Sequence, residues 1–171
     1  MSSSPTVMTE AAAVNPGRSV LAIDYGRQRM GLALSDPLGM TARPLMILTR
    51  SNRRGDLSRF REICRRHNVA TIIVGWPLRL DGSASEMGHE AARFAERLRR
   101  NLGLPVHLVD ERLSSWEARL TVETATPGRG RKDVDDVAAA IILRDYLSQA
   151  RRGVHGAGAE GHAPRDTGSE G

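Results

Sequence analysis

Three acidic residues stand at positions from which a folded chain could bring them together. Asp24 ends one apolar run, Glu111 follows another, and Asp135 lies near the start of an apolar helical stretch. Carboxylate oxygens without a cluster of His or Cys are typical ligands of Mg²⁺ or Mn²⁺ rather than of zinc. The trio predicts a two-metal site for phosphodiester hydrolysis, where one metal activates water and the other stabilises the leaving oxygen.

The three acids differ in how strongly the sequence supports them. Asp24 would lie at the rim of a buried sheet, where a charge is costly without a partner, although a plain turn at a strand end is the alternative reading. Asp135 shares a helical face with Ala138 and Ala139, whose small side chains would let the helix approach the sheet. Asp136 points about 100° away and suits a helix start. Periodicity alone therefore favours Asp135 without deciding the choice.

The elements that must position these acids follow from apolar runs and helical spacing. The chain is expected to form strands at 20–24, 30–35, 44–48, 70–74 and 106–109, and helices at 55–67, 85–100, from Ser114 onwards and at 133–149. The short gap between the first two strands predicts a hairpin. The first, fourth and fifth strands are joined through helices, so they should be parallel, with right-handed crossovers. Their carboxyl ends would then share the edge where open α/β sheets bind ligands.

Composition indicates one α/β domain with a polyanionic partner. The chain has 171 residues with 40% hydrophobic content, and residues 18–151 are expected to form the domain between disordered tails at 1–17 and 152–171. Aromatic residues make up only 4%, which argues against a base-stacking module. Twenty-five cationic residues face 20 acidic ones, and this net charge of +5 favours binding to nucleic acid phosphates.

The remaining residue types point to a cytoplasmic protein. The single Cys64 cannot form an internal disulfide, lies on the apolar side of a predicted helix, and is expected in the core. No secretory signal and no apolar stretch near the ~20 residues of a membrane span is evident. The five histidines show no ligand spacing and are expected at the surface or in packing.

Four sequence blocks, in order, resemble the YqgF/RuvX family. They are Ile23-Asp-Tyr-Gly-Arg-Gln-Arg-Met-Gly-Leu-Ala-Leu-Ser-Asp36 with Thr41-Ala-Arg-Pro-Leu45, Ile73-Val-Gly-Trp-Pro-Leu-Arg-Leu-Asp-Gly82, Asp110-Glu-Arg-Leu-Ser114 and Val134-Asp-Asp-Val-Ala-Ala-Ala-Ile-Ile-Leu143. The resemblance covers about residues 19–150 and implies an RNase H-like domain, a mixed five-stranded sheet flanked by helices, related to the RuvC resolvases. The family has been described as a Holliday junction resolvase and as a nuclease that matures the 5′ end of pre-16S rRNA. Its catalytic acids fall on Asp24, Glu111 and Asp135, which selects Asp135 over Asp136.

Cationic residues near these blocks are candidates for contacts with substrate phosphates. The family commonly has Thr-Lys where this chain has Arg27-Gln28, so Arg27 or Arg29 would have to take the role of that lysine if it contacts substrate. The family also has an aliphatic residue where this chain has Trp76. A basic loop precedes the helix that carries Asp135, and its alternative reading is a solvated flexible loop. The predicted substrate-binding residues are Arg27, Arg29, Arg112, Arg129, Arg131 and Lys132.

Four functions compete at this point. The leading one is a metal-dependent endonuclease acting on structured RNA, the small-subunit rRNA precursor, with Mg²⁺ or Mn²⁺ as cofactor. A Holliday junction resolvase on DNA is the alternative, and cutting a symmetric junction would require a two-fold dimer, so monomer and homodimer both stay open. A non-catalytic nucleic-acid-binding module would not need all three acids. The Asp24-x-Gly26 pattern also resembles the phosphate loop of actin-like ATPases, but this chain has room for only one of their two lobes.

Overall fold

Five apolar runs of the sequence pair into one mixed sheet with the strand order β3-β2-β1-β4-β5. The computed structural model describes residues 14–111 and 134–156, except for the side chains of 134–136 and 153–156. The elements are β1 Ser19–Asp24, β2 Arg29–Ser35, β3 Ala42–Thr49, α1 Arg53–Arg66, β4 Val69–Trp76, α2 Glu86–Leu102, β5 Val106–Asp110 and α4 Val134–Gly156. The predicted mixed five-stranded α/β sheet with flanking helices is therefore confirmed.

The connections follow the predicted pattern. β1 and β2 form an antiparallel hairpin, while β1 pairs with β4, and β4 with β5, in parallel. Each observed strand is longer than predicted by one or two residues at one or both ends, and the bounds of α1 and α2 differ from the predicted ones by one or two residues. The largest difference is at α4, which is predicted to end at Gln149. α4 continues to Gly156 because Ala150 is buried and Arg151 donates to carbonyl groups of the β2–β3 connection.

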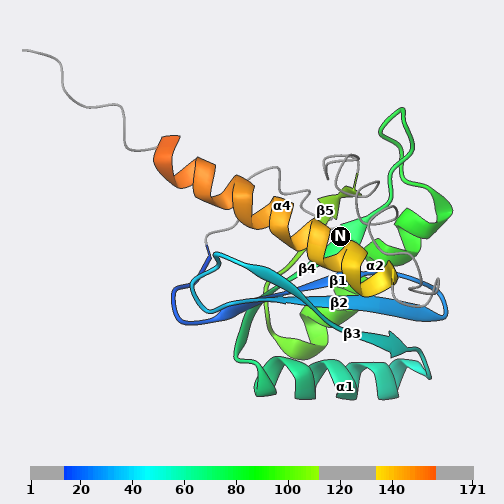
Figure 1. Ribbon diagram of the computed structural model, residues 1–171. Coiled ribbons are helices and arrows are strands. Elements are labelled where there is room, and N and C mark those ends of the chain that lie inside the picture. The colour runs from blue at the N-terminus through cyan, green and yellow to red at the C-terminus, as the bar shows by residue number, and fades with distance from the viewer. Residues whose placement is uncertain (1–13, 112–133, 157–171) are drawn as a thin grey trace, which may run out of the picture.

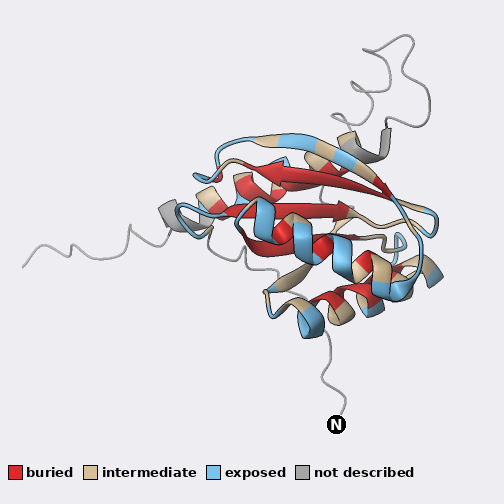
Figure 2. Ribbon diagram, turned by 90° about the horizontal axis from the view of Figure 1, so that it is seen from below, coloured by how far each residue is buried: buried red, intermediate tan, exposed pale blue. Residues whose placement is uncertain are grey.

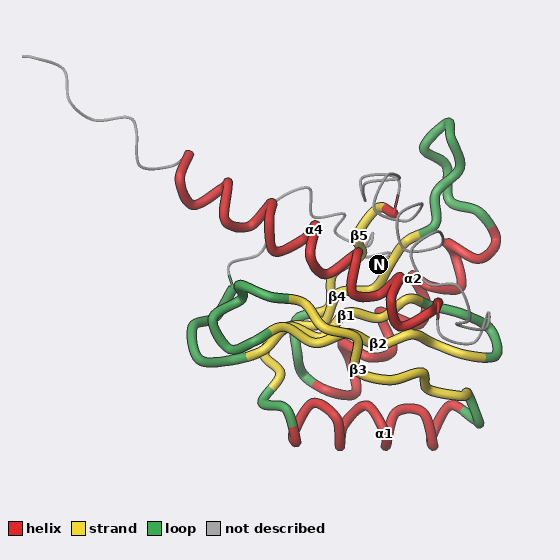
Figure 3. Tube along the Cα trace, in the orientation of Figure 1, coloured by secondary structure: helices red, strands yellow, loops and turns green. Residues whose placement is uncertain are grey.

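Side-chain alternation along the strands divides the core between the two faces of the sheet. On β1, Leu21 and Ile23 pack with the apolar residues of α1 and α2. Val20 and Ala22 of the same strand pack with α4. Figure 1 and the tube in Figure 3 show α4 crossing one face of the sheet and α1 lying beyond the other. Figure 2 shows the buried residues along the strands and the sheet-facing sides of the helices.

Local caps fix where the helices on one face begin and end. The side chain of Asn52 accepts a hydrogen bond from the amide of Gly55, and that of Ser85 from the amide of Gly88, at 2.9 and 3.0 Å. α2 ends at Gly103, which adopts the left-handed conformation with φ of 65°. Cys64 of α1 is buried against the sheet, as predicted.

The outer strand β3 is irregular. Met46 pairs with Leu32 and Pro44 with Ala33, so that Leu45 is an extra residue on β3 and forms a β-bulge. Proline has no N–H group and is tolerated within sheets at edges and bulges. The position of Pro44 in the sheet is thus consistent with its chemistry.

Several expectations concern segments beyond the described residues. The predicted helix from Ser114, the basic loop before α4, and residues 1–13 and 157–171 of the expected tails lie there. Gly17, at the inner end of the first of these tails, donates its N–H to the carbonyl of Pro37 at 3.0 Å. Among the helices of the described residues, none is long and apolar enough to span a membrane.

Candidate active site

The carboxyl ends of β1, β4 and β5 meet at one edge of the sheet. The parallel register places Ile23 beside Val74, and Val74 beside Leu108, so the three strands run together towards this edge. Asp24 is the last residue of β1, and Glu111 directly follows the last residue of β5. The structure thus brings these two predicted site residues to the same edge.

Asp24 lies on the sheet face that α4 covers. Val20 and Ala22 of β1 belong to the same buried cluster as Ala139 and Ile142 of α4. Because alternate residues of a strand share a face, Asp24 continues the series of Val20 and Ala22. Its carboxylate is therefore positioned at the carboxyl end of β1 on the α4 side.

Glu111 extends over Gly75 on this same face. A methyl group built on Gly75 would lie 2.6 Å from Oε1 of Glu111 and 3.0 Å from Cδ1 of Ile142, so the carboxylate uses the space of the missing side chain. The β1–β4 register brings Gly75 next to Asp24, and Gly31 of β2 is its partner on the other side. Both neighbours of Asp24 thus lack a side chain, and the space over Gly75 is used by the second acid, Glu111.

The first turn of α4, which contains Asp135, lies towards this edge. Near the other end of α4, Nη1 of Arg151 donates to the carbonyls of Gly39 and Met40, in the β2–β3 connection at the opposite edge of the sheet. Asp135 precedes the fully buried Ala139 by four residues, about one helical turn. Among the described side chains, which exclude that of Asp135, no group of three His, Cys, Asp or Glu is arranged to hold a metal ion.

The loop that follows Asp24 is fastened to the other face of the sheet. Tyr25 packs against Phe94 of α2 with ring centroids 5.3 Å apart. Its hydroxyl accepts a hydrogen bond from Nη1 of Arg50 at 3.0 Å, and Nε of Arg50 pairs with the buried Asp56 at 3.3 Å. An open depression of about 320 Å³ lies along this loop, lined by residues 24–29. Asp24 therefore ends a strand whose next residue is held through a chain of polar contacts to α1.

The predicted phosphate-binding arginines differ in their surroundings. Arg27 forms ion pairs with Glu90 of α2 at 2.7 Å and with Glu86 at 3.6 Å. The hydrogen bond and charge of Glu90 raise the pKa of Arg27, and the hydrogen bond from Arg27 lowers the pKa of Glu90. Arg29 begins β2. The residues Arg112, Arg129, Arg131 and Lys132 lie outside the described part of the chain.

Two contributors to this edge were not expected from the sequence. The predicted strand 70–74 stops before Gly75, whereas β4 continues through it to Trp76. A glycine within an apolar strand indicates close approach of another group, and this signal was present. Arg50 gave no signal, because its role depends on Tyr25, which is 25 residues away in the sequence.

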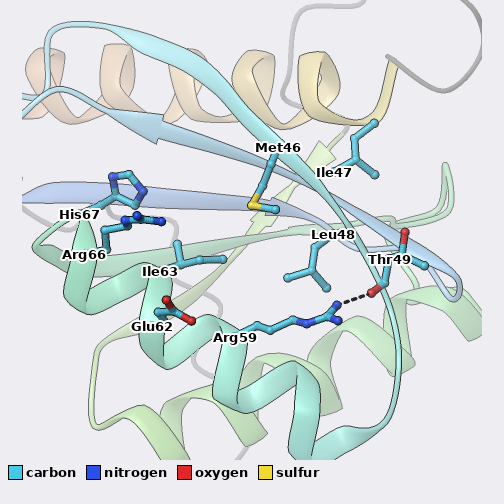
Figure 4. Close-up of a pocket in the computed structure, with 9 residues that line it drawn as sticks. All are labelled: Met46, Ile47, Leu48, Thr49, Arg59, Glu62, Ile63, Arg66 and His67. Carbon is cyan, nitrogen blue, oxygen red and sulfur yellow. Dashed lines mark hydrogen bonds between the residues drawn. The ribbon is translucent and has the colours of Figure 1, made fainter.

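A second hollow, of about 430 Å³, lies between β3 and α1 (Figure 4). Met46 and Ile63 line it, and Arg59 donates to the carbonyl of Thr49 at 2.9 Å. Among the described residues that line this groove, Glu62 is the single carboxylate. The groove therefore lacks the paired acids found at the carboxyl edge of the sheet.

The strand order, with an antiparallel β1–β3 unit followed by parallel β4 and β5, and the acids at the carboxyl edge define an RNase H-like domain. The RuvX family, described as Holliday junction resolvase, matches residues 18–149, and the chain belongs to this family. The predicted family and fold are both confirmed.

Relatives and a solved structure agree with this assignment. A protein of Koribacter versatilis is 43% identical over 150 residues, covering 86% of this chain and 95% of the relative. One of Geobacillus kaustophilus is 41% identical over 135 residues, covering 77% and 98%. Both carry the name "Putative pre-16S rRNA nuclease". The fold is similar to that of Thermus thermophilus RuvC in complex with Holliday junction substrate, with a TM-score of 0.53 and 18% identity over 80% of this chain and 96% of RuvC.

Proposed function

We propose that this chain is a metal-dependent endonuclease that hydrolyses phosphodiester bonds in structured RNA, with the 5′ leader of the small-subunit rRNA precursor as its substrate. The observation that carries this proposal is the convergence of Asp24 and Glu111 at one sheet edge beneath α4, where the strand neighbours of Asp24 are glycines. The names of the relatives at about 40% identity supply the substrate.

Asp24, Glu111 and Asp135 are the residues that would hold Mg²⁺ or Mn²⁺. Carboxylate oxygens are the donors that these ions prefer, and Glu111, a partly buried residue, extends over Gly75 on the face where Asp24 ends β1. When bound, two such ions supply activation of the attacking water and stabilisation of the leaving oxygen. This role requires no nucleophilic side chain from the protein.

The remaining residues of the edge would prepare the site for a phosphate. Gly31 and Gly75 place no side chain of their own beside Asp24, and the space over Gly75 is taken by the Glu111 carboxylate, so the two acids can act on one phosphodiester. Arg50 holds the loop after Asp24 through Tyr25, which limits the motion of the carboxylate. Fixing reacting groups before the reaction lowers the entropic cost of reaching the transition state.

The experiment that tests the proposal compares neighbouring acids on α4. Purified protein with Asp24→Asn, Glu111→Gln or Asp135→Asn is expected to lose at least about a hundredfold in cleavage of a pre-16S 5′-leader RNA with Mg²⁺ or Mn²⁺, since each substitution removes a metal ligand. Asp136→Asn, one residue further along the same helix, is the matched control and should retain activity. Circular dichroism verifies that all four variants are folded.

The same assay decides between RNA and DNA. A synthetic four-way DNA junction is offered beside the RNA, because the family is described as Holliday junction resolvase. Symmetric cutting of the junction without cleavage of the RNA would establish the resolvase function instead. If wild-type protein binds either substrate but cleaves neither with any divalent metal, the chain is a binding module and the proposal fails.

A further inference from the structure

The helices α1 and α2 give the sheet face opposite α4 a strongly cationic surface. Together these two helices carry ten arginines and five carboxylates, whereas α4 carries three arginines and three aspartates. The positive charge of the described helices is thus concentrated on the face turned away from Asp24 and Glu111. Charge of this kind attracts polyanions independently of sequence.

Some of the arginines of α1 and α2 are already paired with carboxylates of the same face. Arg99 and Arg100 both pair with Glu96, at 2.6 and 2.8 Å. In contrast, the guanidinium groups of Arg53, Arg93 and Arg97 make no hydrogen bond and no ion pair with any other described residue. Glu90, three residues before Arg93 on α2, forms its ion pair with Arg27 instead.

These three guanidinium groups gather where the start of α1 approaches the middle of α2. Phe94 of α2 lies beneath Arg50, whose Cζ is 5.8 Å from the ring centroid. Arg93 and Arg97 flank Phe94 in the helix, and Arg53 begins α1 three residues after Arg50. Burial lowers the pKa of Arg97, and the charges of Arg53, Arg50 and Arg93 lower it further. Like charges held together in this way are stabilised by an anion.

The cluster begins directly behind the carboxylates. Asp24 and Tyr25 are adjacent residues on opposite faces of the sheet, and Nη1 of Arg50 donates to the Tyr25 hydroxyl and, at 3.4 Å, to the carbonyl of Gly26. A strand that is bound at the carboxylates and turns around this edge would therefore reach the arginines of α1 and α2. Contacts to phosphates position a nucleic acid without reading its sequence.

We propose that Arg53, Arg93 and Arg97 form a second phosphate-backbone site, which binds the part of the nucleic acid substrate flanking the scissile bond. This inference rests on the proposed nuclease function. It assigns part of the substrate binding to the sheet face covered by α1 and α2, whereas the hydrolysis would take place on the face covered by α4. The arginines are positioning residues and touch no reacting atom.

The test measures binding without cleavage. Affinity for the 5′-leader RNA is determined at several salt concentrations, in metal-free buffer and in an Asp24→Asn background. Arg93→Gln/Arg97→Gln is compared with Arg99→Gln/Arg100→Gln, which removes the same charge from the same helix but at arginines already paired with Glu96. The first double variant should bind at least about tenfold more weakly, with the salt slope reduced by about one per arginine, while the control changes little.

Further arms keep the result unambiguous. Arg93→Lys/Arg97→Lys should restore binding, because a phosphate accepts a lysine as a point charge. Equal losses in the two Gln variants would overturn the inference, since only total charge would then matter. Unchanged binding in Arg93→Gln/Arg97→Gln would overturn it as well. Cleavage of the same RNA by the Asp24→Asn protein after addition of Mg²⁺ would instead overturn the proposed function, and the two failures are therefore distinguishable.

Discussion

At the scale of single residues, the absence of a side chain at Gly75 allows the Glu111 carboxylate to lie close to the end of β1, where Asp24 stands. Oε1 of Glu111 lies within 2.6 Å of where a β-carbon of residue 75 would stand, and Asp24 ends the neighbouring strand. The clash would involve the tip of a flexible side chain rather than the backbone. A larger residue at position 75 would therefore displace the carboxylate without opposing the fold.

We predict that Gly75→Ala separates activity from stability. The added methyl group should push the Glu111 carboxylate and Cδ1 of Ile142 aside, so that cleavage falls by about tenfold or more while the unfolding free energy changes by less than about 1 kcal/mol. Cleavage rates and urea unfolding curves of the same preparation check both parts. Full activity in this variant would show that the position of Glu111 tolerates displacement.

Gly103→Ala is the matched control and should behave in the opposite way. Gly103 ends α2 with φ of 65°, and a methyl group there would meet no other atom within 4 Å. Alanine is strained in this conformation, so the unfolding free energy should fall by about 1 kcal/mol. Cleavage at a temperature where the protein is folded should stay at the wild-type level.

At the scale of elements, a buried carboxylate joins α1 to the segments before it. Asp56 lies in the first turn of α1 and is only 3% exposed. Its Oδ2 pairs with Nε of Arg50 at 3.3 Å, and its Oδ1 accepts the N–H of Ser51 at 3.0 Å. Because Arg50 also bonds Tyr25, this carboxylate supports the loop after Asp24 through two intermediates.

We predict that Asp56→Asn lowers the free energy of unfolding by about 2 kcal/mol, since hydrogen bonds to charged groups contribute roughly 1.5–3 kcal/mol and Arg50 would lose its buried partner. Urea titration followed by circular dichroism measures this loss. Glu96→Gln breaks the exposed pairs with Arg99 and Arg100 and should alter the curve little. An equal loss in both variants would contradict the role given to burial.

The elements could be predicted from the sequence because their signals are local. Apolar runs and helical spacing predicted the sheet, and the rule for parallel strands placed Asp24 and Glu111 at one edge. The contact between Glu111 and Gly75 depends on the register of β5 against β4, which no local pattern encodes. The ion pair of Arg27 with Glu90 joins residues 63 positions apart, so local patterns in the sequence could not predict it either.

At the scale of the whole molecule, the accessibility of the Cys64 thiol shows whether α1 stays packed against the sheet. It lies in the core between the sheet and α1, and burial raises the pKa of its thiol to about 11. The neutral thiol is the form that the folded state favours. Its contribution to stability is therefore complete below the pKa of the unfolded chain, near 9, and is lost as the pH rises through about 11.

We predict that a thiol reagent such as dithionitrobenzoate does not label the native protein at pH 8, because thiolate reactivity requires exposure and ionisation. Labelling should begin only as urea unfolds the chain, with the same midpoint as circular dichroism. Rapid labelling in native buffer would mean that α1 separates from the sheet without global unfolding.

The bulge in β3 has a consequence for how copies of this protein coexist in solution. An open sheet has a rim along which another extended chain can add, and repeated addition produces fibres. The rim at β3 is interrupted by Pro44, which cannot donate a hydrogen bond, and by the unpaired Leu45, with the charge of Arg43 beside them. The outer strand of this open sheet is thus protected against polymerisation by its own sequence.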